Sequence, residues 1–269
     1  MMPEAIRSAA ALLADLRLRA EGCDRPIDEL PRSIRPKTLA EAYDLQDAVR
    51  ARLAERGHGA QVGWKIGCTT PVMQKYLDIP HPCAGTLYRA TTYRDEARVA
   101  ADDFFRLGLE CEIAVRLAAD LPPRAGGHRA ETVAPAVAGV MASVEIVDHR
   151  FVDFTTVSTP SLVADDFFSA GCVLGAPRPL AELGDLRSLT GGFAVDGAAP
   201  EKQGRGAAIL GHPLKALAWL ADHLAARGTR LKAGDAVTLG SVVKTIYPQA
   251  GMRIVAQFDR LPAVAIEIV

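Results

Sequence analysis

The sequence lacks the features of several common protein classes. Its five cysteines are scattered, odd in number and without a Cys-x-x-Cys pair, which argues against a disulfide framework or a zinc ribbon and predicts reduced thiols. The net charge is −1 and neither sign forms a long run, so nucleic acid and anionic membrane surfaces are poor candidate partners. No stretch of about 18 apolar residues occurs, and charged residues interrupt positions 1–20, so neither a membrane span nor a signal peptide is expected. We therefore expect a cytoplasmic protein whose partner is a small molecule.

Several motifs of well-known sites are also missing. The glycines at 191–192 and at 204–206 fit neither the dinucleotide pattern nor the P-loop pattern, so nucleotide binding is not predicted. No Gly-x-Ser-x-Gly elbow and no His-Glu-x-x-His pair occurs, which argues against those serine hydrolases and zinc peptidases. The 269 residues can still bury a sizeable core, in one large domain or two small ones.

Hydrophobic periodicity predicts an α+β fold built on a mixed or mainly antiparallel sheet. A helical segment over residues 1–60 is expected to pack on a sheet domain over residues 61–269. The predicted helices cover residues 6–21, 38–57, 70–76 and 212–228, and strand patterns cover 61–66, 85–88, 109–117, 140–147, 170–175, 192–195, 236–239, 253–258 and 263–269.

Three glutamates interrupt two segments that are otherwise typical of buried strands. Every odd position of residues 109–117 is apolar, so Glu110 and Glu112 share the other face of that strand, about 6.6 Å apart at roughly 3.3 Å per residue. Glu145 lies in the apolar run 141–147, where burial of a lone carboxylate would be costly. A divalent cation removes that cost, and carboxylate ligands favour Mg²⁺ or Mn²⁺ over zinc.

A structural role for these glutamates is the alternative. Glu110 and Glu112 would then line the wet face of an antiparallel strand. Glu145 would pair with Arg150, with His149 or with a distant arginine, and would serve packing alone.

Further motifs accompany the glutamates in chain order, and together they resemble the fumarylacetoacetate hydrolase superfamily. The narrower resemblance is to its 2-keto-4-pentenoate hydratase and 4-oxalocrotonate decarboxylase branch, and it covers almost the whole chain. It rests on Glu110-x-Glu112 with the later Glu145, and on Gly63-Trp64-Lys65-Ile66-Gly67, Gly85-Thr86-Leu87-Tyr88, the segment 169–175, the helix beginning at His212-Pro213, and Leu239-Gly240-Ser241.

The resemblance implies a mixed β-sandwich roll with peripheral helices, and a Mg²⁺ or Mn²⁺ ion held by Glu110, Glu112 and Glu145. The implied substrate is a short 2-keto acid or 2-hydroxy-dienoate that chelates the ion and reacts through a metal-stabilised enolate. Lys65 matches the lysine of the family, and we expect it to stabilise charge or donate a proton, with a pKa depressed by burial beside the metal. Its alternative is a surface lysine on a solvated strand face. A homo-oligomer is implied as well, and a complex with a pathway enzyme is a further option.

The chain departs from this branch at two places. Ala90 stands where members carry an aspartate, so the expected second acid or base is absent. The segment 165–168 reads Asp-Asp-Phe-Phe where Asp-Asn-Ala-Ser is usual, so we expect a reshaped pocket. Asp166, or Asp165, is a candidate for proton transfer.

The remaining candidates concern substrate binding. Arg89 is a candidate partner for a second substrate carboxylate, and Phe168 for the wall of a tail pocket, although Phe167 and Phe168 also suit the core. Ser169 and Ser241 lie in the motifs of the resemblance. His212, directly before a proline at a helix start, suits a structural role or a place at the pocket rim.

Three hypotheses for function follow. The first is a divalent-metal-dependent lyase in aromatic compound catabolism, most simply a 2-keto-4-pentenoate-type hydratase. The second is a 4-oxalocrotonate-type decarboxylase or an acylpyruvate hydrolase. The third is a catalytically impaired keto-acid-binding or supporting subunit, which the retained glutamates and Lys65 argue against.

Overall fold

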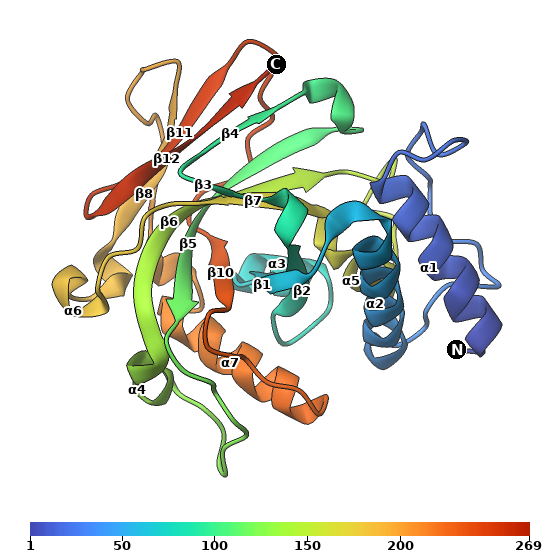
Figure 1. Cartoon of the computed structure of the whole chain (residues 1–269), viewed down its shortest axis with the longest axis horizontal. Helices are drawn as coiled ribbons and strands as arrows, with labels where there is room; N and C mark the ends of the chain where they lie inside the picture. Colours follow the sequence, from blue (N-terminus) through green and yellow to red (C-terminus); the bar gives the residue numbers. More distant parts are fainter.

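Seven α-helices and twelve β-strands make up the computed structural model, which describes residues 1–269 (Figure 1). The helices are α1 (Pro3–Arg17), α2 (Leu39–Leu53), α3 (Pro71–Tyr76), α4 (Ala130–Val133), α5 (Thr159–Ala164), α6 (Leu180–Leu183) and α7 (Pro213–Ala226). The strands are β1 (Gln61–Gly67), β2 (Cys83–Tyr88), β3 (Thr92–Arg94), β4 (Glu96–Val99), β5 (Leu107–Leu117), β6 (Val137–Asp148), β7 (Ser169–Leu174), β8 (Thr190–Val195), β9 (Gln203–Arg205), β10 (Ala236–Ser241), β11 (Arg253–Phe258) and β12 (Leu261–Ile268).

The strands form one mixed sheet in the order β2-β1-β10-β5-β6-β7-β3-β4-β12-β11-β8-β9. The pairs β1–β10, β3–β7 and β4–β12 are parallel and the others antiparallel, which confirms the predicted α+β class with a mixed sheet. Strand β12 also contacts β6, four places away in this order, because the sheet curls back on itself. The result is the roll that the resemblance implied, with helices on its outside (Figure 1).

Helix starts follow the capping residues in the sequence. The Thr38 hydroxyl accepts a hydrogen bond from the Glu41 amide at 3.2 Å, and Thr70 caps α3 in the same way. Prolines occupy the first turn of α3 and α7, where a missing N–H costs nothing. The predicted helix starts near residues 38, 70 and 212 are therefore confirmed, whereas the short elements β3, β4, β9, α4, α5 and α6 were not predicted.

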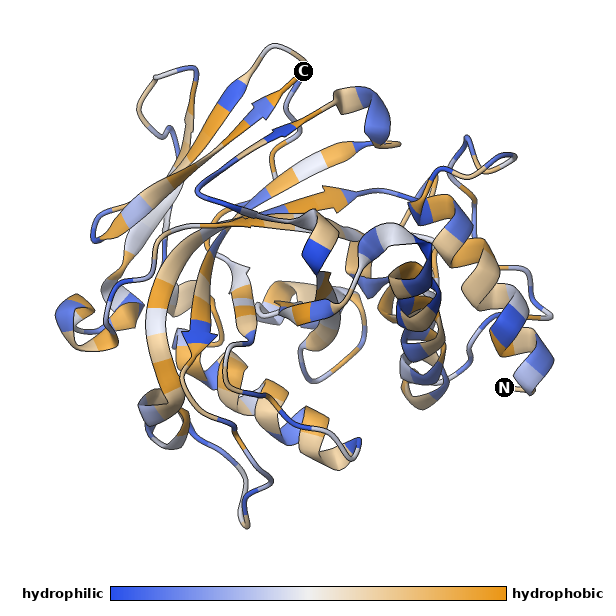
Figure 2. Cartoon of the chain, in the orientation of Figure 1, coloured by the Kyte–Doolittle hydropathy of each residue, from blue (hydrophilic) through white to orange (hydrophobic).

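The N-terminal helices are tied to the sheet by buried polar contacts. The Gln46 side-chain amide donates to the carbonyls of Ala84 and Val163, and one apolar core continues from Ala9 to Ile268. Figure 2 shows hydrophobic residues along the strands, with hydrophilic residues gathered on α2 and the loops. A domain boundary near residue 60 stays a prediction. No helix is long and apolar enough to cross a membrane.

Candidate active site

The three glutamates meet on one face of the two longest strands. Strands β5 and β6 pair in an antiparallel register that sets Glu110 directly opposite Glu145 and Glu112 opposite Ser143. Residues two apart on a strand share a face, so all three carboxylates lie together, and one oxygen of each is within 4.8 Å of the others. Like charges opposite each other destabilise a sheet, so this arrangement needs a compensating cation.

The donor set fits a divalent metal ion. Glu112 and Glu145 are 1% and 2% exposed. Burial raises the pKa of both carboxyls, and the neighbouring glutamates raise the pKa of Glu112 further. Oxygen Oε1 of Glu145 is buried without a well-aligned hydrogen-bond donor, although the Lys65 ammonium lies 3.2 Å away as an ion-pair partner. A buried carboxylate oxygen that lacks a hydrogen bond and lies close to two other carboxylates is a ready ligand for a hard cation. The chain therefore has a divalent metal site formed by Glu110, Glu112 and Glu145.

Neighbouring groups hold two of these glutamates in place. The Thr245 hydroxyl donates to Oε1 of Glu110 at 2.7 Å, and the Gly240 amide donates to Oε2 of Glu112 at 3.3 Å. Gly240 has φ 123°, and a Cβ there would lie 2.3 Å from the Thr69 hydroxyl, so only glycine fits. The sequence motif included Gly240, but nothing in the pattern singled out Thr245.

Lys65 is buried beside the glutamates. It lies on β1 opposite Gly85, where a Cβ would come within 3.0 Å of the lysine stem, so the glycine leaves room for that side chain. The ammonium donates to the Phe167 carbonyl at 3.2 Å and pairs with Glu145. Lys65 is 3% exposed, so its alternative as a surface lysine is wrong.

The electrostatic balance at Lys65 corrects one expectation. Burial lowers the pKa of Lys65, but the carboxylates of Glu145, Glu110 and Glu112 outweigh burial and raise the pKa above its usual value. The prediction of a lowered Lys65 pKa neglected the attraction of these carboxylates. The Lys65 pKa would fall only if a bound cation offset the charge of the three glutamates.

A left-handed turn covers the other side of Lys65. Asp166, Phe167 and Phe168 have φ of 54°, 47° and 66°, a conformation that costs non-glycine residues about 1–2 kcal/mol each. Asp166 accepts hydrogen bonds from Arg17 at 2.9 Å and from the Thr86 amide at 3.3 Å.

A second buried ion pair supports the same turn. The Arg150 side chain donates to Asp165 at 2.8 Å and to the Ser169 carbonyl at 3.2 Å. Arg150 is completely buried and Asp165 is 1% exposed. Sequence inspection missed Arg17 and considered Arg150 only as a partner for Glu145, because neither arginine belongs to a motif of the resemblance.

Two further candidates, Phe168 and Ser169, lie where the left-handed turn leads into β7. Ser169 is 3% exposed, and its hydroxyl helps to lower the pKa of Glu145 against the larger effect of burial. Phe168 is partly buried and stacks on His149 with ring centres 4.8 Å apart. The Nε2 atom of His149 shares a hydrogen bond with the Tyr247 hydroxyl, at a distance of 3.1 Å.

The structure does not bring all candidates to the glutamates. Arg89 is exposed in a short 3₁₀ helix, with its Cβ beside Gly59. His212 caps α7 by accepting the Leu214 amide at 3.1 Å, among Asp185 and other charges outside the metal site. Ser241 pairs with Glu112 in the sheet, but its hydroxyl donates to the carbonyls of Val243 and Cys111.

Two known proteins are similar to almost the whole chain. No family model matches the chain. A 2-keto-4-pentenoate hydratase of Burkholderia vietnamiensis is 34% identical over 257 residues, which cover 96% of each chain. A 4-oxalocrotonate decarboxylase of Pseudomonas putida is 30% identical over 266 residues, which cover 99% of this chain and 97% of the relative.

Solved structures show the same likeness. The 4-oxalocrotonate decarboxylase from Pseudomonas putida G7, complexed with magnesium and adipate, superposes with a TM-score of 0.91 at 28% identity, over 100% of this chain and 99% of that one. A fumarylpyruvate hydrolase from Pseudomonas aeruginosa, in complex with Mn²⁺ and pyruvate, superposes with a TM-score of 0.58 at 13% identity, over 77% of this chain and 88% of that one. The second likeness shows the fold alone.

Proposed function

We propose, from the premise that this chain belongs to the 2-keto-4-pentenoate hydratase and 4-oxalocrotonate decarboxylase branch of the fumarylacetoacetate hydrolase superfamily, that it is a divalent-metal-dependent lyase. Its substrate is a short 2-keto acid or the corresponding 2-hydroxy-dienoate, and its simplest activity is addition of water to the dienoate. The observation that carries the proposal is the convergence of three carboxylates beside a buried lysine ammonium.

Glu110, Glu112 and Glu145 would hold Mg²⁺ or Mn²⁺, the ions that all-carboxylate sites prefer. When bound, the ion supplies a Lewis acid that stabilises negative charge on the C2 oxygen of a keto acid. Thr245 fixes the orientation of Glu110, and Gly240 fixes that of Glu112, so the two carboxylates need little reorganisation when the ion binds.

Lys65 holds a proton at Nζ, between Oε1 of Glu145 and the Phe167 carbonyl. From this position it serves as the proton donor to the substrate or as a fixed positive charge beside it. Burial keeps competing water away from the ammonium, which strengthens either effect.

Asp166 takes the place of the missing second acid or base at Ala90 in this proposal. Asp166 lies next to the Lys65 side chain, because a Cβ on Gly85 would be 3.2 Å from its Oδ1 and 3.0 Å from Cε of Lys65. The Arg17 guanidinium fixes one carboxylate oxygen, and the other faces the Thr86 amide. Arg17 thereby acts as a positioning residue for Asp166.

Decarboxylation of a 4-oxalocrotonate-type substrate is the second candidate. Curated relatives carry both activities, and the full-length structural match is a decarboxylase. Ala90 also removes the aspartate that favoured water addition.

Product analysis distinguishes the two candidates. Wild type, Lys65→Met and the exposed-lysine control Lys75→Met are incubated with Mg²⁺ and either 2-hydroxypenta-2,4-dienoate or 4-oxalocrotonate, while hydration and CO₂ release are followed. We expect hydration without CO₂ release, reduced about 100-fold or more in Lys65→Met and unchanged in the control. CO₂ release from 4-oxalocrotonate without dienoate hydration would establish the decarboxylase instead, and no metal-dependent turnover of either would contradict the lyase proposal.

A further inference from the structure

Two cysteines meet where the strand that carries Lys65 ends. Gly67, the last residue of β1, pairs directly with Cys83 at the start of β2, and Cys68 follows Gly67. Paired residues on antiparallel strands have Cα atoms about 4.5–5.5 Å apart, and the next Cα lies about 3.8 Å further along the chain. At right angles, these steps put the Cα atoms of Cys68 and Cys83 about 6 Å apart, within the range of about 4.4–6.8 Å that disulfides span.

The backbone conformation of Cys68 brings its thiol to that of Cys83. In a regular strand, Cys68 would face the opposite side from Gly67 and Cys83. Its φ of 59° is left-handed and ends this alternation, and the two thiols share a hydrogen bond. That hydrogen bond, and next burial, raise the pKa of the Cys83 thiol well above its usual value. The two residues, called the thiol pair below, are thus neighbours while both are reduced.

One member of the thiol pair is accessible and the other is not. Cys68 is partly exposed, whereas Cys83 is 1% exposed. No third histidine, cysteine or carboxylate joins the two thiols to form a metal site. An accessible thiol beside a second, resolving thiol is typical of redox-sensing cysteines, because the first reacts with the oxidant and the second closes the disulfide.

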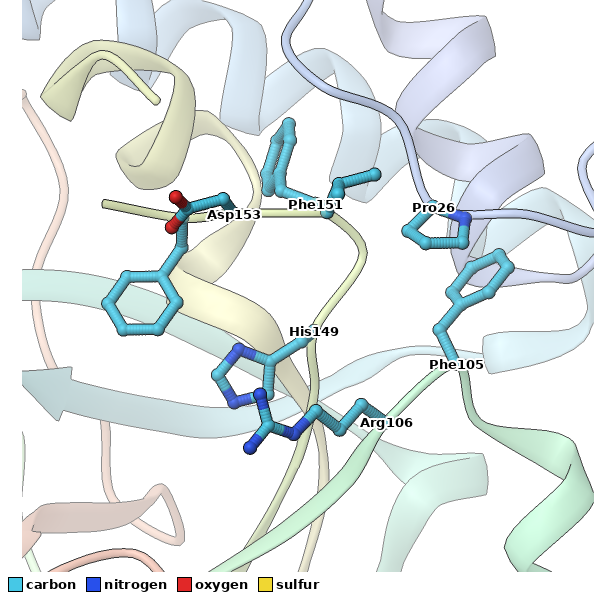
Figure 3. A pocket seen from close by; sticks show the side chains of 8 residues that line it. Pro26, Phe105, Arg106, His149, Phe151 and Asp153 are labelled. Atoms are coloured by element: carbon cyan, nitrogen blue, oxygen red, sulfur yellow. The ribbon is translucent and has the colours of Figure 1, made fainter. Parts of the chain in front are cut away.

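The other three cysteines do not offer such a pair. Cys23 is partly exposed in the loop after α1, where Asp15 and Asp24 lie near its thiol. Cys111 and Cys172 are completely buried. The aromatic pocket of about 280 Å³ shown in Figure 3 has no cysteine in its lining. The thiol pair is therefore the place in the chain where oxidation can close a disulfide.

The thiol pair also lies between two parts of the candidate active site. On one side, a Cβ on Gly67 would be 3.4 Å from Nζ of Lys65. On the other side, the Thr69 hydroxyl lies 2.3 Å from where a Cβ on Gly240 would be, and the Gly240 amide donates to Glu112. A disulfide holds its sulfurs about 2.05 Å apart, closer than two thiols approach, so its formation draws β1 and β2 together at this point. We expect this movement to loosen the support of Glu112.

We propose that Cys68 and Cys83 form a redox switch, which hydrogen peroxide closes to a disulfide and a thiol reductant reopens, and that closure weakens Mg²⁺ binding at the three glutamates. The Cys68 thiolate attacks the peroxide, so that an S–O bond forms, the O–O bond breaks, and the released hydroxide takes up a proton to give water. The Cys83 sulfur then displaces the hydroxyl group from Cys68, which leaves with the Cys83 proton as a second water. The two sulfurs lose two electrons in total, and the peroxide gains them.

Peptide mapping of the whole protein tests closure of the disulfide. Wild type, Cys83→Ser and the control Cys23→Ser are treated with hydrogen peroxide in the folded state, remaining thiols are alkylated after unfolding, and the protein is digested with trypsin. Cleavage after lysine and arginine puts the two cysteines of the thiol pair on separate peptides, 66–75 and 76–89, which only a disulfide can join.

We expect the joined peptides in wild type and in Cys23→Ser, and their separation by dithiothreitol. Cys83→Ser should instead accumulate the sulfenic acid of Cys68, which dimedone captures, because the resolving thiol is missing. Separate peptides in peroxide-treated wild type, with Cys68 alkylated or oxidised to a sulfinic acid, would overturn the switch.

Calorimetric titration with Mg²⁺ tests the effect of closure on the metal site. Oxidised wild type should bind Mg²⁺ about 10-fold more weakly than the reduced protein, and dithiothreitol should restore the affinity. Peroxide-treated Cys68→Ser, which cannot close the disulfide, should keep the affinity of its untreated form. Equal affinities of oxidised and reduced wild type, or the same weakening in Cys68→Ser, would contradict control of the metal site by this disulfide.

Discussion

The two sides of Lys65 are built in different ways. On one side, Glu110, Glu112 and Glu145 stand on regular strands, and their positions follow from alternation and register. On the other side, the turn 166–168 has three successive left-handed residues, which the chain would not adopt unaided. Two ion pairs hold this turn: Arg17, distant in sequence, pairs with Asp166, and the buried Arg150 pairs with Asp165. The metal side is thus fixed by local structure, and the turn side by tertiary contacts.

Removal of Arg150 should have the largest effect on the turn. Arg150→Met leaves the buried Asp165 carboxylate unpaired, which is expected to cost about 3–5 kcal/mol of unfolding free energy in urea denaturation. The control is Arg98→Met, since Arg98 and Glu267 form an exposed ion pair whose loss should cost far less. Equal losses in the two variants would mean that the turn does not depend on this pair.

The metal side should respond to pH through Glu112 and Glu145. Their pKa values are raised from 4.5 by burial, so between pH 4.5 and the raised values the folded chain binds more protons than the unfolded chain. Stability without added metal therefore falls as pH rises through this window. Mg²⁺ at 100 times its Kd should add about 2.7 kcal/mol once the carboxylates are ionised.

Thermal unfolding in MgCl₂ and in EDTA, repeated over a pH series, measures this difference. The Mg²⁺-induced shift in Tm should vanish at acid pH and grow as pH rises. A shift that is independent of pH would contradict binding of the ion to these buried carboxylates.

Variants of Arg17 and Asp166 distinguish two roles of Asp166, support of the turn and proton transfer. Arg17→Met leaves a buried carboxylate unpaired, whereas the double variant with Asp166→Asn removes both charges, so we expect a coupling energy of about 1–3 kcal/mol in a double-mutant cycle. If Asp166 transfers protons, the double variant regains stability but not turnover. Recovery of turnover with stability would show that Asp166 only shapes the turn.

The smallest effect is expected at the support of Glu110. Thr245→Val keeps the shape but removes the hydroxyl that donates to Glu110, so Mg²⁺ affinity should fall about 10-fold. Thr132→Val, which removes a hydroxyl bonded to the backbone on α4, should leave affinity unchanged. Unchanged affinity in Thr245→Val would show that the strands alone position the ligand.

The same contrast explains what could be predicted from the sequence. Period-two alternation placed Glu110 and Glu112 on one face, and the apolar run around Glu145 marked it as buried, because strands impose these relations locally. The mixed sheet and the starts of α2, α3 and α7 were equally accessible from apolar runs and capping residues. Short strands such as β3 and β9 carry too few residues to show a period.

The other parts of the site could not be predicted from the sequence, because they depend on contacts between residues that are distant in sequence. Arg17 and Asp166 are 149 residues apart, and no local pattern links them. Nor does the sequence show that Thr245 and Tyr247 lie beside β5, since only the pairing of Ile246 with Leu109 brings them there. Nor does the sequence show that Arg89, chosen because it follows the Gly-Thr-Leu-Tyr motif, lies exposed in a short 3₁₀ helix.

Calorimetric titration with Mg²⁺, with and without oxalate, on wild type and on Glu112→Gln tests the central claim most directly. We expect oxalate to bind wild type only when Mg²⁺ is present, and we expect the substitution to abolish both events because it removes a buried ligand of the site. Oxalate binding that needs no metal, or that survives in Glu112→Gln, would contradict a keto-acid site built on the three glutamates.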